Sequence, residues 1–466
     1  MQTFLSHKTE NEAHKIALEI VLLANFDHWL KNASSMVQDW VAHIHFHPEP
    51  GACLTIAGPD NRIDLAVVFV DVDSMELLRP ADIGFACTAL PAHSYQLITK
   101  LSPNQLSQVA LGWQLGTYVF DRYKSEVIKP RAGTLLVDDS VDVEATIELA
   151  RSVAFGRDLV NTPAEDMGPS ELGDVIRNLA DGYGATVTEL SADELLDQNL
   201  PLIHAVGRAS DDPPRLLDMK WGDPAAPKLT LVGKGVCFDS GGVLAKDFPG
   251  MRQMKTDMGG AALALALARQ IMSSQLFVRL RVLIPAVENC VAANAYRPGD
   301  VFKSRKGKTV EVAHPDAEGR LVLADALALA DEESPDVLIS MATLTGAVTE
   351  ALGEEIAAFM TPSTDLMSVL QHSGLATGDP LWPLPLWRPY QRLLKSDVAD
   401  LCHITEGYGG AGAITAAQFL GHFVERATNY IHIDFAGWNG RADAGYQRGG
   451  NVSGMRALYD WLINRF

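Results

Sequence analysis

Strand-like apolar runs and helix-length apolar stretches alternate over the last two thirds of the chain. The runs at 228–236 (KLTLVGKGV) and 278–287 (VRLRVLIPAV) have the length and composition of buried strands. The same pattern predicts strands at 309–313, 336–344 and 430–437, and helices at 260–272, 319–331, 413–425 and 453–463. Such alternation is typical of an α/β fold with a mainly parallel sheet flanked by helices on both faces. Sites in these sheets lie beyond the carboxyl ends of the strands.

The first 140 residues predict a second, smaller α/β domain. Apolar strands at 53–57 and 64–70 alternate there with helical stretches, notably at 105–124. A helix-length segment at 142–161 follows, and the prolines and glycine of TPAEDMGPSE then interrupt it. For a chain of this length we expect an N-terminal α/β domain at 1–140, a linking helix at 141–162 and a larger C-terminal domain at 163–466.

Composition and charge narrow the function classes. The formal net charge is −20, so a general electrostatic affinity for nucleic acid or anionic lipid is not expected. The five cysteines are scattered and form no CxxC pair, which favours free thiols in a reducing compartment. The N-terminus lacks a basic-then-apolar signal layout, and no apolar run reaches the ~18–20 residues of a membrane span. We therefore expect a cytoplasmic protein that does not enter a membrane.

The segment HIHFH at 43–47 is a first candidate for chemistry. If it is a strand, His43, His45 and His47 share one face and could hold a metal ion. No carboxylate cluster accompanies them, so an ordinary surface or core face explains the pattern as well.

A glycine-rich segment at 231–260 is the second candidate. It places Lys234, Asp239, Lys246 and Asp257 between a predicted buried strand and a predicted core helix. Charges at the edge of a core need partners. Its GKG is followed by Val-Cys instead of Ser or Thr, so the segment fails the phosphate-loop pattern.

A second dense segment, HPDAEGRLVLADAL at 314–327, supplies such partners. It carries Asp316, Glu318 and Arg320 after the strand at 309–313. Lys234, Asp316 and Thr343 each fall where a predicted strand ends. An Asp or Glu at a helix start is commonly an N-cap, so each acid alone is weak evidence.

Taken together, the four acids Asp239, Asp257, Asp316 and Glu318 would repel one another in one crevice unless cations intervened. Two divalent ions, Zn²⁺, Mn²⁺ or Mg²⁺, about 3.5–4 Å apart would match them and would activate a bridging water as hydroxide.

The basic residues of the two segments suit different roles. Lys234, buried beside metals, can lose its proton and act as a ligand. Lys246, in the following loop, suits a charged group that faces a substrate carbonyl or the oxyanion formed from it. Arg320 is always charged and suits an anion.

These motifs resemble the leucyl aminopeptidase family, the two-metal M17 peptidases, from about residue 150 to 466. The resemblance rests on RDLVNTPAEDMGP, AVGRASDDPPRL, LVGKGVCFDSGG, KTDMGGAA, ENCVAANAYRPGDV, DAEGRLVLADAL, ATLTGA, SDVADL and GGAGAITAAQFL. It implies that 163–466 is a catalytic metallopeptidase domain that holds a Zn²⁺ or Mn²⁺ pair through Lys234, Asp239, Asp257, Asp316 and Glu318. Asp239 and Glu318 would bridge the ions, and Asp316 would also coordinate through its carbonyl.

The family likeness also implies a reaction. Lys246 and Arg320 would be catalytic, with a bicarbonate on Arg320 as proton shuttle. The substrate would be a peptide with a free N-terminal amine, bound by one metal and Asp257 and cleaved by a metal-activated hydroxide. By position, the pocket for its first side chain would be lined by Met254, Thr343, Gly346 and Ala436. A homohexamer is expected.

The chain departs from the family pattern at several positions. His314-Pro315 stands where the family usually has Asn-Thr, and Cys237 where many relatives have Thr. Trp438 and Asn439 lie near a position that is usually apolar and small, which makes a strict preference for leucine doubtful. The N-terminal 140 residues show no convincing match to the family.

Other functions remain as alternatives. A hexameric architectural or DNA-binding relative is disfavoured by the acidic composition. A non-catalytic scaffold is disfavoured because every catalytic position is present. Phosphoester cleavage is disfavoured because no basic cluster exists beyond Lys246 and Arg320.

Overall fold

The computed structural model describes the chain apart from residues 9–14, 59, 61, 127–131, 406, 408 and 443–446. The described residues form two compact units, Met1–Ala154 with Gly440–Arg448, and Phe155–Asn439 with Gly449–Phe466. The division falls inside helix α6 (Val143–Asn161), which carries the chain from the first unit into the second. Among the described helices, none combines the length and the apolar character that crossing a membrane requires.

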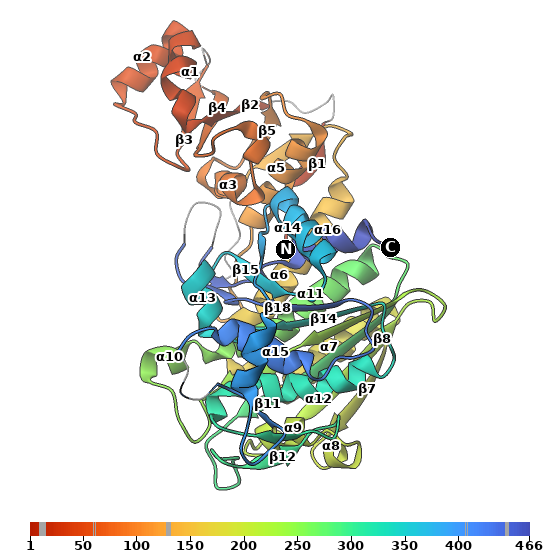
Figure 1. Ribbon diagram of the computed structural model, residues 1–466. Helices are drawn as coiled ribbons and strands as arrows, with labels where there is room; N and C mark the ends of the chain where they lie inside the picture. The colour runs from red at the N-terminus through yellow and green to blue at the C-terminus, as the bar shows by residue number, and fades with distance from the viewer. Residues whose placement is uncertain are drawn as a thin grey trace. The chain divides into compact units, whose positions relative to one another are not determined.

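The smaller unit is built on a six-stranded sheet with the order β1-β6-β5-β2-β4-β3 (Figure 1). Its strands are β1 (Leu5–His7), β2 (Ile16–Leu22), β3 (Cys53–Ala57), β4 (Ile63–Val70), β5 (Ser94–Leu97) and β6 (Thr134–Val137). Its helices are α1 (Phe26–Asn32), α2 (Ser35–His43), α3 (Pro80–Gly84), α4 (Ala86–Ala89) and α5 (Pro103–Gly116). Leu18 and Ile20 of β2 pack in one core and Val21 in another, so both faces of the sheet are covered.

The condition for a histidine site at 43–47 is not met, and one expected helix is shorter than the pattern suggested. Residues 43–47 are not a strand, because α2 runs through His43 and the chain then turns at His45, whose φ is 49°. His43, His45 and His47 are all exposed. The helix expected at 105–124 ends at Gly116. Spacing over five residues does not distinguish a strand from a helix end followed by a turn.

The larger unit contains a nine-stranded sheet with the order β16-β15-β18-β14-β9-β11-β8-β7, and β10 pairs with β11 beside that path. Its strands are β7 (Thr186–Ser191), β8 (Arg215–Trp221), β9 (Lys228–Gly233), β10 (Gly235–Asp239), β11 (Arg279–Asn289), β14 (Val337–Ala342), β15 (Ala357–Met360), β16 (Leu381–Pro383) and β18 (Tyr430–Asp434). Strands β10, β11, β9, β14 and β18 pair in parallel, and antiparallel pairs occur at β7-β8, β8-β11 and β15-β18. The expected α/β class with a mainly parallel sheet is confirmed.

Helices cover both faces of this sheet (Figure 1). The helices of the unit are α7 (Pro169–Tyr183), α8 (Glu194–Asp197), α9 (Pro201–Gly207), α10 (Phe248–Arg252), α11 (Gly259–Ser273), α12 (Gly319–Asp331), α13 (Gly346–Leu352), α14 (Thr364–Thr377), α15 (Gly412–Gly421) and α16 (Met455–Ile463). Gly233 of β9 faces α11, whereas its neighbour Val232 packs in the core that holds the apolar side chains of α12. Successive residues of β9 therefore contact helices on opposite faces.

The strand expected before Asp316 is not part of this sheet. β13 (Thr309–Glu311) lies in a separate sheet between β12 (Val301–Lys303) and β17 (Leu401–Cys402). Asp316 lies in a short 3₁₀ helix, η5 (Pro315–Ala317), and does not end a strand of the main sheet. Apolar alternation indicates that a strand exists but not to which sheet it belongs. Lys234 and Thr343 do directly follow β9 and β14, as expected.

The start of α11 lies very close to β14. A Cβ atom on Gly260 would be 2.1 Å from the carbonyl oxygen of Met341 and 2.8 Å from Cα of Ala342. We expect Gly260→Ala to lower the free energy of unfolding by about 1–3 kcal/mol, because backbone atoms would have to move. The measurement is urea unfolding, with the midpoint compared at constant slope.

Gly182 in α7 is the matched control for this substitution. A Cβ atom there meets nothing within 4 Å, so Gly182→Ala should raise stability by up to ~1 kcal/mol through helix propensity. A Gly260→Ala variant as stable as the parent would contradict the close approach of α11 to β14.

Candidate metal centre

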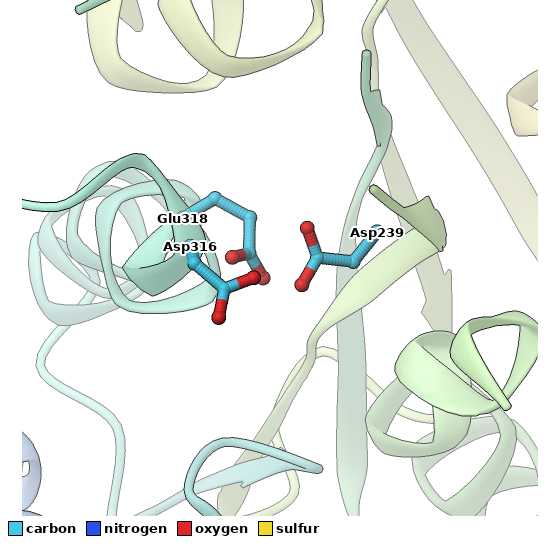
Figure 2. A group of neighbouring side chains, drawn as sticks. All are labelled: Asp239, Asp316 and Glu318. Atoms are coloured by element: carbon cyan, nitrogen blue, oxygen red, sulfur yellow. The ribbon is translucent and has the colours of Figure 1, made fainter. Parts of the chain in front are cut away.

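Three acidic side chains of the larger unit meet at one point. Asp239 is the last residue of β10, Asp316 lies in η5, and Glu318 directly precedes α12. One carboxylate oxygen from each lies within 4.8 Å of the others. Figure 2 shows Asp316 and Glu318 reaching from the start of the helix toward Asp239 at the end of the strand. A site thus forms where β10 ends and α12 begins.

Asp257 and Lys234 complete this cluster. Asp257 lies in the 3₁₀ helix η4 (Met254–Met258), and Lys234 connects β9 to β10. Both side chains are buried, and Lys234 Nζ lies 2.7 Å from Asp257 Oδ1 and 2.9 Å from Glu318 Oε1. Burial lowers the pKa of Lys234, but the charges of Asp257 and Glu318 outweigh it and hold the pKa above its usual range. The amine is therefore an ammonium in this arrangement. Divalent cations beside it would reverse that balance.

Lys246 approaches the cluster from the loop after β10. Its Nζ lies 2.8 Å from Asp239 Oδ2 and also contacts Asp316 Oδ1. Burial lowers the pKa of Lys246, but the charge of Asp239 and the bonds to Asp239 and Asp316 raise it by more, so the net shift is upward. The ammonium group is thus held at the edge of the cluster in its charged form.

The carboxylates carry more negative charge than the two lysines neutralise. Burial, and next the charge of Glu318, raise the pKa of Asp239 to about 6, and burial raises that of Asp257 well above its usual range. For Glu318, burial is outweighed by Lys234 and the pKa falls to about 2. Within the described part of the chain, the buried atoms Asp257 Oδ2 and Glu318 Oε2 have no hydrogen-bond partner. Buried carboxylate oxygens without a donor suit divalent cations, so these residues fit a metal pair.

Two further residues orient the cluster, and sequence reasoning missed both. Asn289, at the end of β11, donates through Nδ2 to Asp239 Oδ1 at 2.8 Å and to the carbonyl of Pro315 at 3.0 Å. Tyr296 Oη donates to the same carbonyl at 2.5 Å. Asn289 could have been found from the sequence, because it is a polar residue at the carboxyl end of a predicted buried strand, where sites in such sheets lie. These bonds tie the end of β10 to the residue before Asp316.

Arg320 lies in the first turn of α12 and is 8% exposed. Its Nη1 donates to the carbonyl of His403 at 2.8 Å, and among described groups its Nε has no partner. Burial lowers the pKa of Arg320 to about 10, so the guanidinium keeps its charge near neutral pH. A fixed cation with a spare donor suits an anion.

The residues expected in a side-chain pocket are only partly brought together. Thr343 Oγ1 donates to Asp257 Oδ1 at 3.0 Å, so Thr343 joins the cluster. Met254 lies in η4, three residues before Asp257. Gly346 begins α13, where a Cβ atom would meet nothing within 4 Å. Ala436 follows β18, and its neighbour Gly437 comes close to Thr343.

The positions that depart from the family pattern have ordinary partners. Cys237 is 1% exposed, and burial raises its pKa well above the usual value. His314 Nδ1 accepts the backbone N–H of Asp316 at 3.2 Å. Trp438 and Asn439 form β19, which pairs with β20 (Gly449–Gly450). The ring of Trp438 lies 5.4 Å from Lys255 Nζ, and Asn439 Oδ1 accepts from Asn451 at 3.1 Å.

Known proteins similar to this chain cover both units. The family model described as the cytosol aminopeptidase family, catalytic domain, matches residues 154–459. A second model, described as M17 aminopeptidase, N-terminal domain, matches residues 16–136. The expectation that the N-terminal residues lack a family match is therefore wrong.

Individual relatives agree with these models. A probable cytosol aminopeptidase of Syntrophotalea carbinolica is 41% identical over 369 residues, which is 75% of this chain and 73% of the relative. The crystal structure of the cytosol aminopeptidase from Coxiella burnetii is 40% identical, with a TM-score of 0.91 over 99% of both chains. The bottromycin maturation enzyme BotP in complex with Mn is 30% identical, with a TM-score of 0.85 over 97% of this chain and 100% of that one. With both units matched, the chain belongs to the M17 family of cytosol aminopeptidases.

Proposed function

We propose that this chain is a dinuclear metalloaminopeptidase that removes the N-terminal residue from peptides. Two divalent ions, Zn²⁺ or Mn²⁺, would be held by the ligand set Lys234, Asp239, Asp257, Asp316 and Glu318. The observation that carries the proposal is the convergence of these acids with two buried carboxylate oxygens that lack a partner among the described residues. The relative solved in complex with Mn supports manganese as one of the ions.

The chain's own groups would act around this centre. When bound, the metal pair supplies positive charge that acidifies a water molecule and polarises the scissile carbonyl. Lys246, an ammonium beside Asp239 and Asp316, would donate to the oxyanion that develops on that carbonyl. Asp257, with Oδ2 free of partners within the described chain, would accept from the α-amine of the substrate. Arg320 would hold an anion such as bicarbonate through its spare Nε donor.

The remaining features of the proposal rest on family membership. We infer a homohexamer, a cytoplasmic location in keeping with the relatives' name, and a pocket for the first side chain lined by Met254, Thr343, Gly346 and Ala436. The net charge of −20 offers no support for DNA binding as the function.

A matched pair of substrates tests the reaction. With Mn²⁺ or Zn²⁺ present, aminoacyl nitroanilides with a free amine should be hydrolysed at least ~10²-fold faster than their N-acetyl counterparts. An acetylated nitrogen cannot replace the α-amine, and a buried polar group left without its substrate partner costs binding energy. The measurement is kcat/KM over a panel of first residues. Equal hydrolysis of both forms, or none of any free-amine substrate, would overturn the proposed function.

A further inference from the structure

His403 is a fully buried histidine beside the candidate metal centre. It directly follows β17 (Leu401–Cys402) and is 0% exposed. β17 pairs with β13, and the backbone N–H of His403 continues that pairing by donating to the carbonyl of Glu311 at 3.2 Å. The residue therefore sits next to the segment that leads into η5 and α12.

The imidazole ring bonds to the backbone of this segment at both nitrogens. Nδ1 lies 3.2 Å from the backbone nitrogen of Ala313 and 3.1 Å from the carbonyl oxygen of Glu311, and Nε2 lies 3.0 Å from the carbonyl oxygen of His314. In a neutral ring, a proton on Nε2 is donated to His314 and leaves Nδ1 to accept from the N–H of Ala313, since the Glu311 carbonyl already accepts the backbone N–H of His403. Burial, and next the charge of Arg320, lower the pKa of His403 to about 3, which agrees with a neutral ring.

These bonds continue to the acids of the cluster. His314, held at its carbonyl by His403, accepts the backbone N–H of Asp316 at its own Nδ1, 3.2 Å away. The carbonyl of His403 accepts from Arg320 Nη1 at 2.8 Å. One residue thus contacts the chain before Asp316 through its ring and the guanidinium after Glu318 through its main chain.

We propose that His403 is a positioning residue for the reaction, which sets the segment 313–320 in place by joining its beginning to Arg320. The inference rests on the proposed function and extends it to a residue outside the ligand set. Without the ring, the approach to Asp316 loses two backbone bonds, and the main chain of His403 is held on this segment by its bond to Glu311 alone. The carbonyl that accepts from Arg320 is then held less firmly, and so is the direction in which Arg320 presents Nε.

A double-mutant cycle tests this role. His403→Phe keeps a ring of similar size but removes both nitrogen contacts, and kcat should fall ~10–100-fold with little change in KM, as for outer residues that orient catalytic groups. In an Arg320→Lys background the same substitution should cost much less, because both changes affect one unit. The matched control is His422→Phe, a half-buried histidine after α15 that contacts none of these groups, and it should leave kcat near the wild-type value.

Two outcomes would overturn the inference. One is a His403→Phe variant with wild-type kcat, and the other is a full effect that persists unchanged beside Arg320→Lys. If the phenylalanine variant does not fold, His403→Leu, which also removes both nitrogen contacts, is used in the same cycle with the same criteria.

A crystal structure of the wild-type protein supplies a readout that needs no turnover. It should keep Nε2 of His403 on the carbonyl of His314 and Nη1 of Arg320 on the carbonyl of His403. Separation of either pair would overturn the inference even if no variant folds. If the wild-type protein hydrolyses no free-amine substrate, the proposed function fails. If it does and the cycle is additive, only the role of His403 fails.

Discussion

Stripping divalent metal from the protein is expected to lower kcat/KM for free-amine nitroanilides by more than ~10⁴-fold, because a bound metal lowers the pKa of water to about 7. Re-addition of Mn²⁺ or Zn²⁺ should restore turnover. The measurement is activity after dialysis against chelator, with the metal content of the same sample determined by mass spectrometry. Full activity at negligible metal content would contradict the proposal.

The pH dependence of stability, measured with and without metal, tests whether the ions bind at the acidic cluster. Burial raises the pKa of Asp239 to about 6, above the ~3.9 of an unfolded aspartate. Between these values the folded chain binds more protons than the unfolded chain, so the stability of the metal-free protein should fall as pH rises from about 4 to about 6. Metal binding should reverse this trend, because the ions bind the ionised carboxylates. An unchanged trend after metal loading would place the ions elsewhere.

Glu318→Gln is expected to lower kcat/KM by at least ~10³-fold, since the charge stabilisation supplied by a metal is worth several kcal/mol and each 1.4 kcal/mol is tenfold. Glu318 is 1% exposed and Gln has nearly the same shape, so the packing is retained while the charge is lost. Lys234 keeps Asp257 at 2.7 Å, which preserves one partner for the buried ammonium. The measurements are kcat/KM and the number of ions bound per chain, which should fall below two.

Asp325→Asn is the control for Glu318→Gln. Asp325 is also a buried carboxylate of α12, but it accepts the backbone N–H groups of Leu202 and Arg305 and lies outside the cluster. The substitution should reduce stability, because the new amide N–H₂ group would face a backbone N–H that the carboxylate now accepts. The metal content should stay at the wild-type level. Two bound ions and wild-type turnover in Glu318→Gln would exclude Glu318 as a ligand.

Local patterns in the sequence predicted the elements that carry the site. The continuous apolar stretch at 260–272 predicted α11, and α12 spans residues 319–331, as expected. Predictions failed where a short pattern suited more than one structure. Residues 43–47 satisfied the period of a strand but end a helix, and β13 alternates like a main-sheet strand although it pairs in a separate sheet.

By itself, the sequence determined the α/β class, the family of the catalytic domain and the acids that converge, because periodicity and short motifs depend on residues that are neighbours in the chain. The tertiary structure alone decided which distant groups hold them. Asn289 and Asp239 are 50 residues apart, and Arg320 and the carbonyl of His403 are 83 apart. Such contacts depend on how sheets and helices pack, which no local pattern encodes.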